Sequence, residues 1–145
     1  MLNRGERKKL KYSNGRYYVD VDISKEEWLD LLNDPEVFDK YSLDMVIGFY
    51  LMKNHQAASK EMKEKYYPTL KGTPYNGIVI ALGKKILKKL NYRFYIESSD
   101  SEKSESFWSI PFEGYHVNYD PSQLFIWKLR DELVSALDIF LNKSL

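Results

Sequence analysis

Two helical segments joined by a very short connection most constrain what this chain can fold into. A short helix over residues 57–66 ends before Pro68, because proline cannot continue a helix. A few residues later, Thr73 supplies an N-cap and Pro74 stands at the first helical position, which predicts a second helix over residues 73–90. Because the connection is short and contains glycine, the two helices must pack closely against each other.

Three further helices are expected around this pair. Ser24 and Glu27 have the spacing of a capping box, in which each side chain accepts a hydrogen bond from the other residue's backbone amide, so a helix begins there and buries Trp28. Ser42 is expected to cap the next helix. The apolar positions of that helix recur at helical spacing and are Leu43, Val46, Ile47, Tyr50 and Leu51. An amphipathic helix that begins near residue 130 closes the chain.

The expected strands follow the helix 73–90. Aromatic and branched residues at 92–97 and at 107–112 predict two strands. The polar segment between them would form the tip of a two-stranded wing. Residues 113–123 are expected to form a loop, and residues 124–129 a third strand.

Length and composition predict one domain with an α+β fold. With 145 residues and 43% apolar side chains, the chain can bury one core. Residues 23–145 are expected to form that domain, and residues 1–22 a basic arm or a hairpin, because Asn14-Gly15 favours a type I′ turn. No segment has the ~20 apolar residues of a membrane span, and the N-terminus lacks the apolar region of a signal peptide. These features predict a cytoplasmic protein without a membrane partner.

Positive charge is concentrated in one part of a nearly neutral chain. The formal net charge is +1, yet residues 66–96 hold six Lys or Arg and no Asp or Glu. On the helix 73–90, small residues near the start precede the lysines, as expected of a helix that enters a groove of double-stranded DNA and contacts phosphates with its end. The expected DNA contacts are Thr73, Tyr75, Asn76, Gly77, Ala81, Lys84, Lys85, Lys88 and Arg93. Of these, Thr73, Tyr75 and Asn76 are expected near base edges.

Residues for catalysis or metal binding are sparse. The chain has no cysteine and only two histidines, His55 and His116. Disulfides, thiolate zinc sites and cysteine nucleophiles are therefore excluded, and any other metal site would need distant carboxylates to converge on a histidine. We expect no metal, no cofactor and no enzymatic activity.

The order of elements over about residues 23–112 resembles the winged helix-turn-helix superfamily, in which a wing follows the helix that enters the major groove. Three blocks, ISKEEWLDLLNDPEVF, PYNGIVIALGKKILKKL and FWSIPFEGYHVNYDPSQLFIWKLRDELVSAL, resemble an accessory domain of modified-cytosine restriction proteins of bacterial type. That resemblance implies DNA binding within a restriction system, leaves a preference for modified bases open, and assigns cleavage to an HNH nuclease or a McrB-type GTPase partner. This chain has neither an HNH histidine cluster nor a phosphate-binding P-loop.

Other functions fit the same residues. A solvated surface helix also carries lysines, and a small regulator acting as a homodimer would use the same face. The acidic segment 98–106 and the acidic C-terminal half instead suit a protein-interaction module, such as a mobile-element inhibitor or adaptor, that binds a basic partner. Tyr115, His116 and Tyr119 could in turn supply an aromatic pocket for a flipped base.

Overall fold

The computed structural model describes residues 5–69, 75–98, 105–119 and 122–142, and it has the mixed α and β structure expected from the sequence. The helices are α1 (Lys25–Leu32), α2 (Lys40–Leu51), α3 (Ser59–Tyr66), α4 (Tyr75–Lys89) and α5 (Asp131–Asn142), with a short 3-10 turn, η1 (Lys53–His55). The strands are β1 (Glu6–Lys9), β2 (Lys11–Ser13), β3 (Arg16–Tyr18), β4 (Gln56–Ala58), β5 (Phe94–Glu97), β6 (Phe112–Tyr119) and β7 (Ser122–Leu129).

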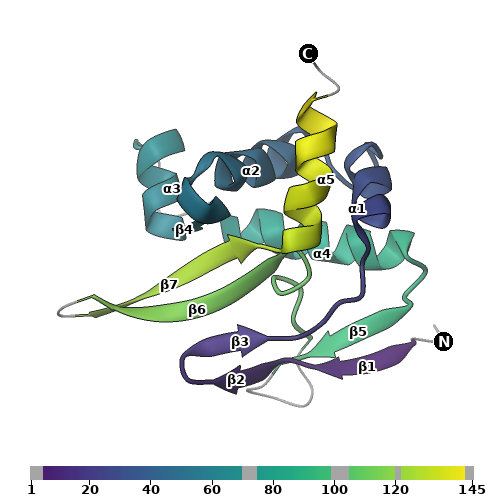
Figure 1. The fold of residues 1–145 in the computed structure, drawn as a ribbon, viewed down its shortest axis with the longest axis horizontal. Helices are drawn as coiled ribbons and strands as arrows, with labels where there is room; N and C mark the ends of the chain where they lie inside the picture. The colour runs from purple at the N-terminus through teal and green to yellow at the C-terminus, as the bar shows by residue number, and fades with distance from the viewer. Residues whose placement is uncertain (1–4, 70–74, 99–104, 120–121, 143–145) are drawn as a thin grey trace.

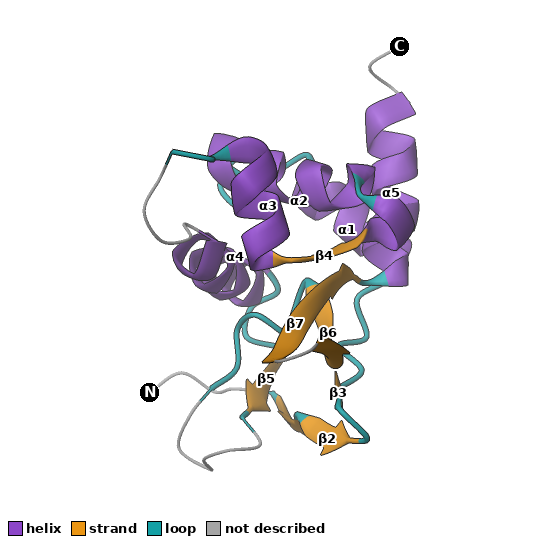
Figure 2. Ribbon diagram, turned by 90° about the vertical axis from the view of Figure 1, so that its left-hand side faces the viewer, coloured by secondary structure: helices purple, strands orange, loops and turns teal. Residues whose placement is uncertain are grey.

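An antiparallel sheet joins distant parts of the chain. Its strand order is β2-β3-β6-β7-β4, and β1 and β5 form a separate parallel pair. The β6–β7 hairpin is paired from Phe112↔Leu129 to Tyr119↔Ser122, and β4 joins β7 at Ala57↔Trp127. Most of the helices gather on one side of the strands, and the β6–β7 hairpin extends away from the helices (Figures 1 and 2).

The predicted wing of residues 92–97 and 107–112 is wrong. β5 pairs with β1 and not with residues 107–112. An isolated bridge joins Glu97 to Glu105, and residues 108–111 form turns instead of a strand. Phe107 packs against α4 beside Gly83, and Trp108 packs against Phe125 and Trp127 of the sheet. These aromatic residues are therefore covered without forming a strand. The hairpin forms one segment later, where β6 and β7 include most of the predicted 113–123 loop. The predicted strand 124–129 is confirmed as part of β7.

The helix boundaries follow local capping chemistry. At α1 the capping box is confirmed: Ser24 Oγ accepts from the Glu27 amide, and a Glu27 carboxylate oxygen accepts from the Ser24 amide, both at 3.1 Å. The predicted cap of α2 is wrong, because Asp39 accepts from the Ser42 amide at 2.9 Å and Ser42 is buried inside the helix. The buried side of α2 is also rotated from the predicted stripe: Met45 and Phe49 are buried, whereas Leu51 is 64% exposed. α3 begins at Ser59, two residues later than the predicted start at residue 57, because residues 56–58 form β4.

The hairpin around Asn14-Gly15 is present as β2 and β3, paired from Lys11↔Tyr18 to Ser13↔Arg16. Both turn residues have positive φ, 54° for Asn14 and 80° for Gly15, which is the backbone that a type I′ turn needs. Asparagine and glycine tolerate this conformation better than other residues, so the prediction depended only on local chemistry.

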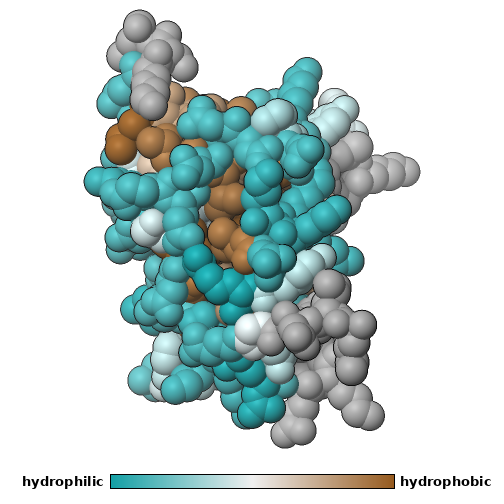
Figure 3. Space-filling view, turned by 90° about the vertical axis from the view of Figure 1, so that its right-hand side faces the viewer, coloured by the Kyte–Doolittle hydropathy of each residue, from teal (hydrophilic) through white to brown (hydrophobic). Residues whose placement is uncertain are grey.

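One core lies between the helices and the sheet. It includes Trp28 of α1, Phe49 of α2 and Phe112 of β6, each at most 1% exposed, and the Phe49 and Phe112 rings lie 4.8 Å apart between centroids. On the face of Figure 3, apolar residues reach the surface mainly as a strip between hydrophilic ones. None of the described helices combines the length and the apolar character that a bilayer span needs.

Candidate nucleic-acid interface

The exposed side of α4 collects five of the residues expected to contact DNA. Apolar residues at helical spacing, Val79, Leu82 and Ile86, form the buried side of α4. The opposite side presents Asn76, Gly77, Ala81, Lys84 and Lys88, all exposed. Helical periodicity explains this separation, because residues three or four apart share a face. The small residues lie toward the start of the helix and the two lysines toward its end.

The four lysines of α4 have different surroundings. Lys85 pairs with Asp39 at 3.2 Å, and Lys89 pairs with Asp34 at 2.7 Å. The Lys89 hydrogen bond lowers the pKa of Asp34. Asp34 and Asp39, in the segment between α1 and α2, thus lie beside a helix whose own sequence has no acidic residue. Screening of two lysines by nearby carboxylates was not visible from the sequence, since these residues are distant along the chain.

Lys84 and Lys88 keep their charge toward solvent. The Lys84 ammonium lies 5.3 Å from the centroid of the Phe107 ring, a cation–π contact that orients the side chain without neutralising it. Lys88 makes no ion pair within the part of the chain that the structure describes. These two side chains are therefore the cations of α4 that are free to contact an anionic ligand.

Two other residues expected to contact DNA, Tyr75 and Arg93, hydrogen-bond to other parts of the protein. Tyr75 is only 2% exposed, and its hydroxyl donates to the Met62 carbonyl at 3.3 Å. Burial raises the pKa of Tyr75 to about 12. Arg93 donates to both carboxylate oxygens of Glu27, at 2.6 and 3.2 Å, and to the Asp22 carbonyl at 2.9 Å. Tyr75 thus packs in the core. Arg93 links the chain after α4 to α1 through Glu27. Thr73, with its predicted N-cap role, lies outside the described residues.

An aromatic pocket lies elsewhere on the sheet. It has a volume of about 180 Å³ and is lined mainly by rings, namely Tyr17, Trp108, His116, Phe125 and Trp127, together with Leu10 and Ser98. His116 is thus in an aromatic pocket, as the sequence suggested, but on β6 rather than in a loop. Tyr115 precedes it on the same strand and so points to the other face. The side chain of Tyr119 lies outside the described residues.

Each of the two histidines packs against an aromatic ring. Within the described ranges, no cluster of three His, Asp or Glu side chains is arranged to hold a metal ion. The His55 ring lies against Tyr50 and hydrogen-bonds through Nδ1 to the Tyr50 carbonyl at 2.7 Å. His116 packs against Phe125, with ring centroids 5.1 Å apart. Both rings thus have packing partners.

Comparison with known proteins gave no relative. No family model, curated protein or solved structure matches the chain. Its function must therefore be inferred from its own surfaces.

Proposed function

We propose that this protein is a non-catalytic module that binds double-stranded DNA through the exposed side of α4. The observation that carries the proposal is the pair of unneutralised lysines, Lys84 and Lys88, on the same face as Asn76, Gly77 and Ala81. Small residues allow a helix to approach a groove closely, while lysines further along bond to phosphates. Among the described residues near the start of α4, Asn76 is the exposed side chain that can hydrogen-bond a base edge, adenine in particular.

The chain topology supports a winged-helix arrangement for this module. β4 lies between α2 and α3, and it pairs with β7, the second strand of the hairpin that follows α4. In this arrangement α2, α3 and α4 are the three helices, α4 is the recognition helix, and the β6–β7 hairpin is the wing. The wing comes later in the sequence than expected, because β5 and the 108–111 turns intervene.

The biological setting follows from the resemblance of the sequence. We propose the specificity module of a restriction system, with cleavage by a nuclease or GTPase partner. A small regulator is the second candidate within the same class. The two differ in what they bind: a regulator is expected to dimerise on one operator, whereas a restriction module responds to cytosine modification in otherwise identical duplexes.

Duplex affinity measured across salt concentrations tests the proposal. Every DNA phosphate that is no longer neutralised should reduce the log–log salt slope by about 0.9, so Lys84→Glu/Lys88→Glu should reduce it by about two units and weaken binding at low salt. Lys25→Glu/Lys53→Glu is the matched control, because it makes the same change in net charge away from α4. Equal effects of the two double variants would show that only overall charge matters. Unchanged binding by Lys84→Glu/Lys88→Glu would rule out α4 as the interface.

A further inference from the structure

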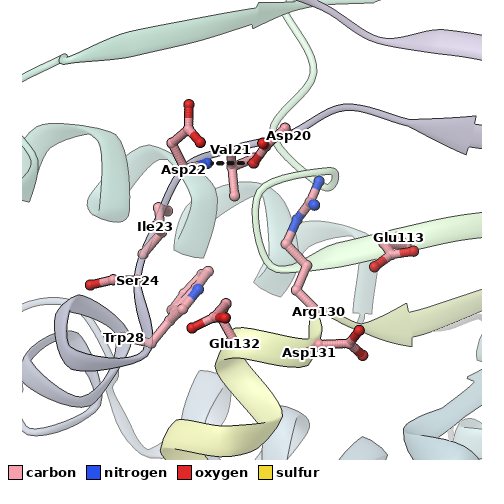
Figure 4. Close-up of a pocket in the computed structure, with 10 residues that line it drawn as sticks. All are labelled: Asp20, Val21, Asp22, Ile23, Ser24, Trp28, Glu113, Arg130, Asp131 and Glu132. Carbon is pink, nitrogen blue, oxygen red and sulfur yellow. Dashed lines mark hydrogen bonds between the residues drawn. The ribbon is translucent and has the colours of Figure 1, made fainter.

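A polar cleft of about 540 Å³ lies beside the start of α5. It opens where two strands part: β3 pairs with β6 only at Arg16↔Tyr115 and Tyr17↔Gly114, and the chain after β3 then leaves the sheet to reach α1. Residues 20–24, the start of β6 and the start of α5 form its walls (Figure 4). α4 and α5 lie on opposite sides of the molecule in Figure 2, so this cleft is separate from the proposed DNA-binding face.

Acidic side chains dominate the lining of the cleft. It contains five carboxylates, those of Asp20, Asp22, Glu113, Asp131 and Glu132, and a single cation, Arg130. Three of the acids, Asp22, Glu113 and Asp131, make ion pairs of 3.2–3.4 Å with Lys8, Arg16 and Lys128. In each pair one side chain is at least 64% exposed, so solvent weakens the attraction.

The two remaining carboxylates accept hydrogen bonds from backbone amides. Asp20 accepts from the Asp22 amide at 2.9 Å, and Glu132 from the Lys25 amide at 2.8 Å. Neither makes an ion pair within the described residues. Because an amide hydrogen bond leaves the negative charge in place, the cleft keeps two carboxylates that can hold a cation.

Arg130 does not remove this negative character. Its guanidinium donates to the carbonyls of Ser109 and Ile110, at 2.6 and 2.9 Å, and so fastens the turn before β6 to the start of α5. Burial lowers the pKa of Arg130 to about 10. The side chain is thus bonded to backbone carbonyls, and it makes no ion pair with Asp20 or Glu132 among the described residues.

Trp28 gives independent evidence for a ligand with an acceptor. The residue is 0% exposed, lines the cleft, and has an indole N–H without a hydrogen-bond partner among the described residues. In Figure 4 the nitrogen-bearing edge of the ring is turned toward Glu132 and the cleft. Buried donors in proteins are nearly always bonded, so an acceptor is expected at this position. Glu132 is exposed and held by one backbone hydrogen bond, so a small rotation of its side chain would let an acceptor reach the indole.

We propose that this cleft binds a basic peptide segment of a protein partner, with an arginine or lysine side chain between Asp20 and Glu132 and a main-chain carbonyl accepting from the Trp28 indole N–H. A phosphate or other anion would be repelled by the unpaired carboxylates of Asp20 and Glu132. A simple cation would leave the indole unbonded. A peptide satisfies both requirements, because it carries a positive side chain beside a carbonyl oxygen.

The indole N–H signal of Trp28 in a ¹H–¹⁵N correlation spectrum tests the proposal directly, once Trp28→Phe has assigned it. The probe is a blocked hexapeptide of alternating glycine and arginine. We expect it to shift the Trp28 signal saturably. The same peptide with neutral citrulline in place of arginine should not bind. Agmatine, which has the guanidinium but no peptide carbonyl, should bind more weakly and leave the Trp28 signal in place.

Charge variants locate the binding to the cleft. Asp20→Asn/Glu132→Gln should raise the Kd of the hexapeptide at least about tenfold, since two charge-assisted hydrogen bonds are removed. Glu26→Gln/Asp30→Asn makes the same charge change on exposed α1 residues outside the cleft and should leave the Kd unchanged. The remaining signals of each spectrum report whether the fold is retained, and Glu132→Gln alone replaces the double variant if it is not.

Three results would overturn the proposal. Equal weakening by both double variants would mean nonspecific attraction to acids. An agmatine shift of the Trp28 signal as large as that of the hexapeptide would mean a cation site without peptide recognition. Saturable peptide binding with an unchanged Trp28 signal, or no binding at all, would mean that the cleft is not the site. None of these outcomes depends on DNA binding by α4.

Discussion

Replacing Gly83 with alanine is expected to destabilise the protein, even though alanine is the better helix former. An added Cβ at this position of α4 would lie 2.6 Å from the Phe107 carbonyl oxygen and 2.9 Å from the Phe107 Cβ. The nearest atom belongs to the backbone and cannot rotate away, so the turn that begins at Phe107 must move off the helix. Overpacking of this kind costs about 1–3 kcal/mol, against about 1 kcal/mol gained in helix propensity, which predicts a net loss of up to about 2 kcal/mol.

Gly77 is the matched control on the same helix. A Cβ there meets nothing within 4 Å, so Gly77→Ala should only gain helix propensity, up to about 1 kcal/mol. Urea unfolding followed by circular dichroism measures the unfolding free energy of both variants. Their difference isolates the overpacking at Gly83, about 1–3 kcal/mol. Equal unfolding free energies for Gly83→Ala and Gly77→Ala would refute the close approach of Phe107 to α4.

Three further predictions concern single side chains. Ser24→Ala should lower the unfolding free energy by about 1 kcal/mol in urea titrations, because α1 loses its capping box; no change would mean that water caps the helix equally well. Arg93 lowers the pKa of Glu27 below its ordinary value of 4.5, so stability from this pair is present above that pH and is lost as the pH falls through the lowered value; Glu27→Gln should flatten the acid limb of a Tm–pH curve. The pKa of Tyr75 is raised from 10.0 to about 12, so the folded state binds this proton more tightly and stability should fall as pH rises between these values. Tyr75→Phe should remove that part of the alkaline loss, and an ultraviolet titration showing every tyrosine ionising near pH 10 would contradict it.

Features fixed by neighbouring residues were predictable from the sequence. The capping box of Ser24 and Glu27 and the positive-φ turn at Asn14-Gly15 depend on interactions within a few residues, and both occur as expected. The buried stripe of α4 follows from helical spacing alone. α2 shows the limit of this approach: Ser42 was a competent cap, but Asp39, three residues earlier, caps the helix in its place.

Features that depend on distant residues were not predictable. The segment after α4 could have paired with residues 107–112, but β1 occupies one edge of β5 in a parallel pairing that no local pattern indicates. For the same reason, some of the candidate DNA contacts are free and others are bonded within the protein. Lys84 and Lys88 stay exposed, whereas Arg93 is taken by Glu27 from a helix far away in the sequence. The polar cleft beside the start of α5 could not be predicted, because its walls come from three separate segments of the chain.

The strand pairings of this fold also determine the order in which it can be completed. β1 pairs Glu6 with Phe94, and β3 pairs Arg16 with Tyr115, so these two strands are synthesised well before the strands with which they pair. Pairing over such sequence distances is slow, and strand edges left open meanwhile can associate with other chains. The backbone hydrogen bonds of the helices between these strands, in contrast, join residues only four apart. Weakening of the β3–β6 pairing would therefore appear first as delayed folding and aggregation of new chains, with helix content largely preserved.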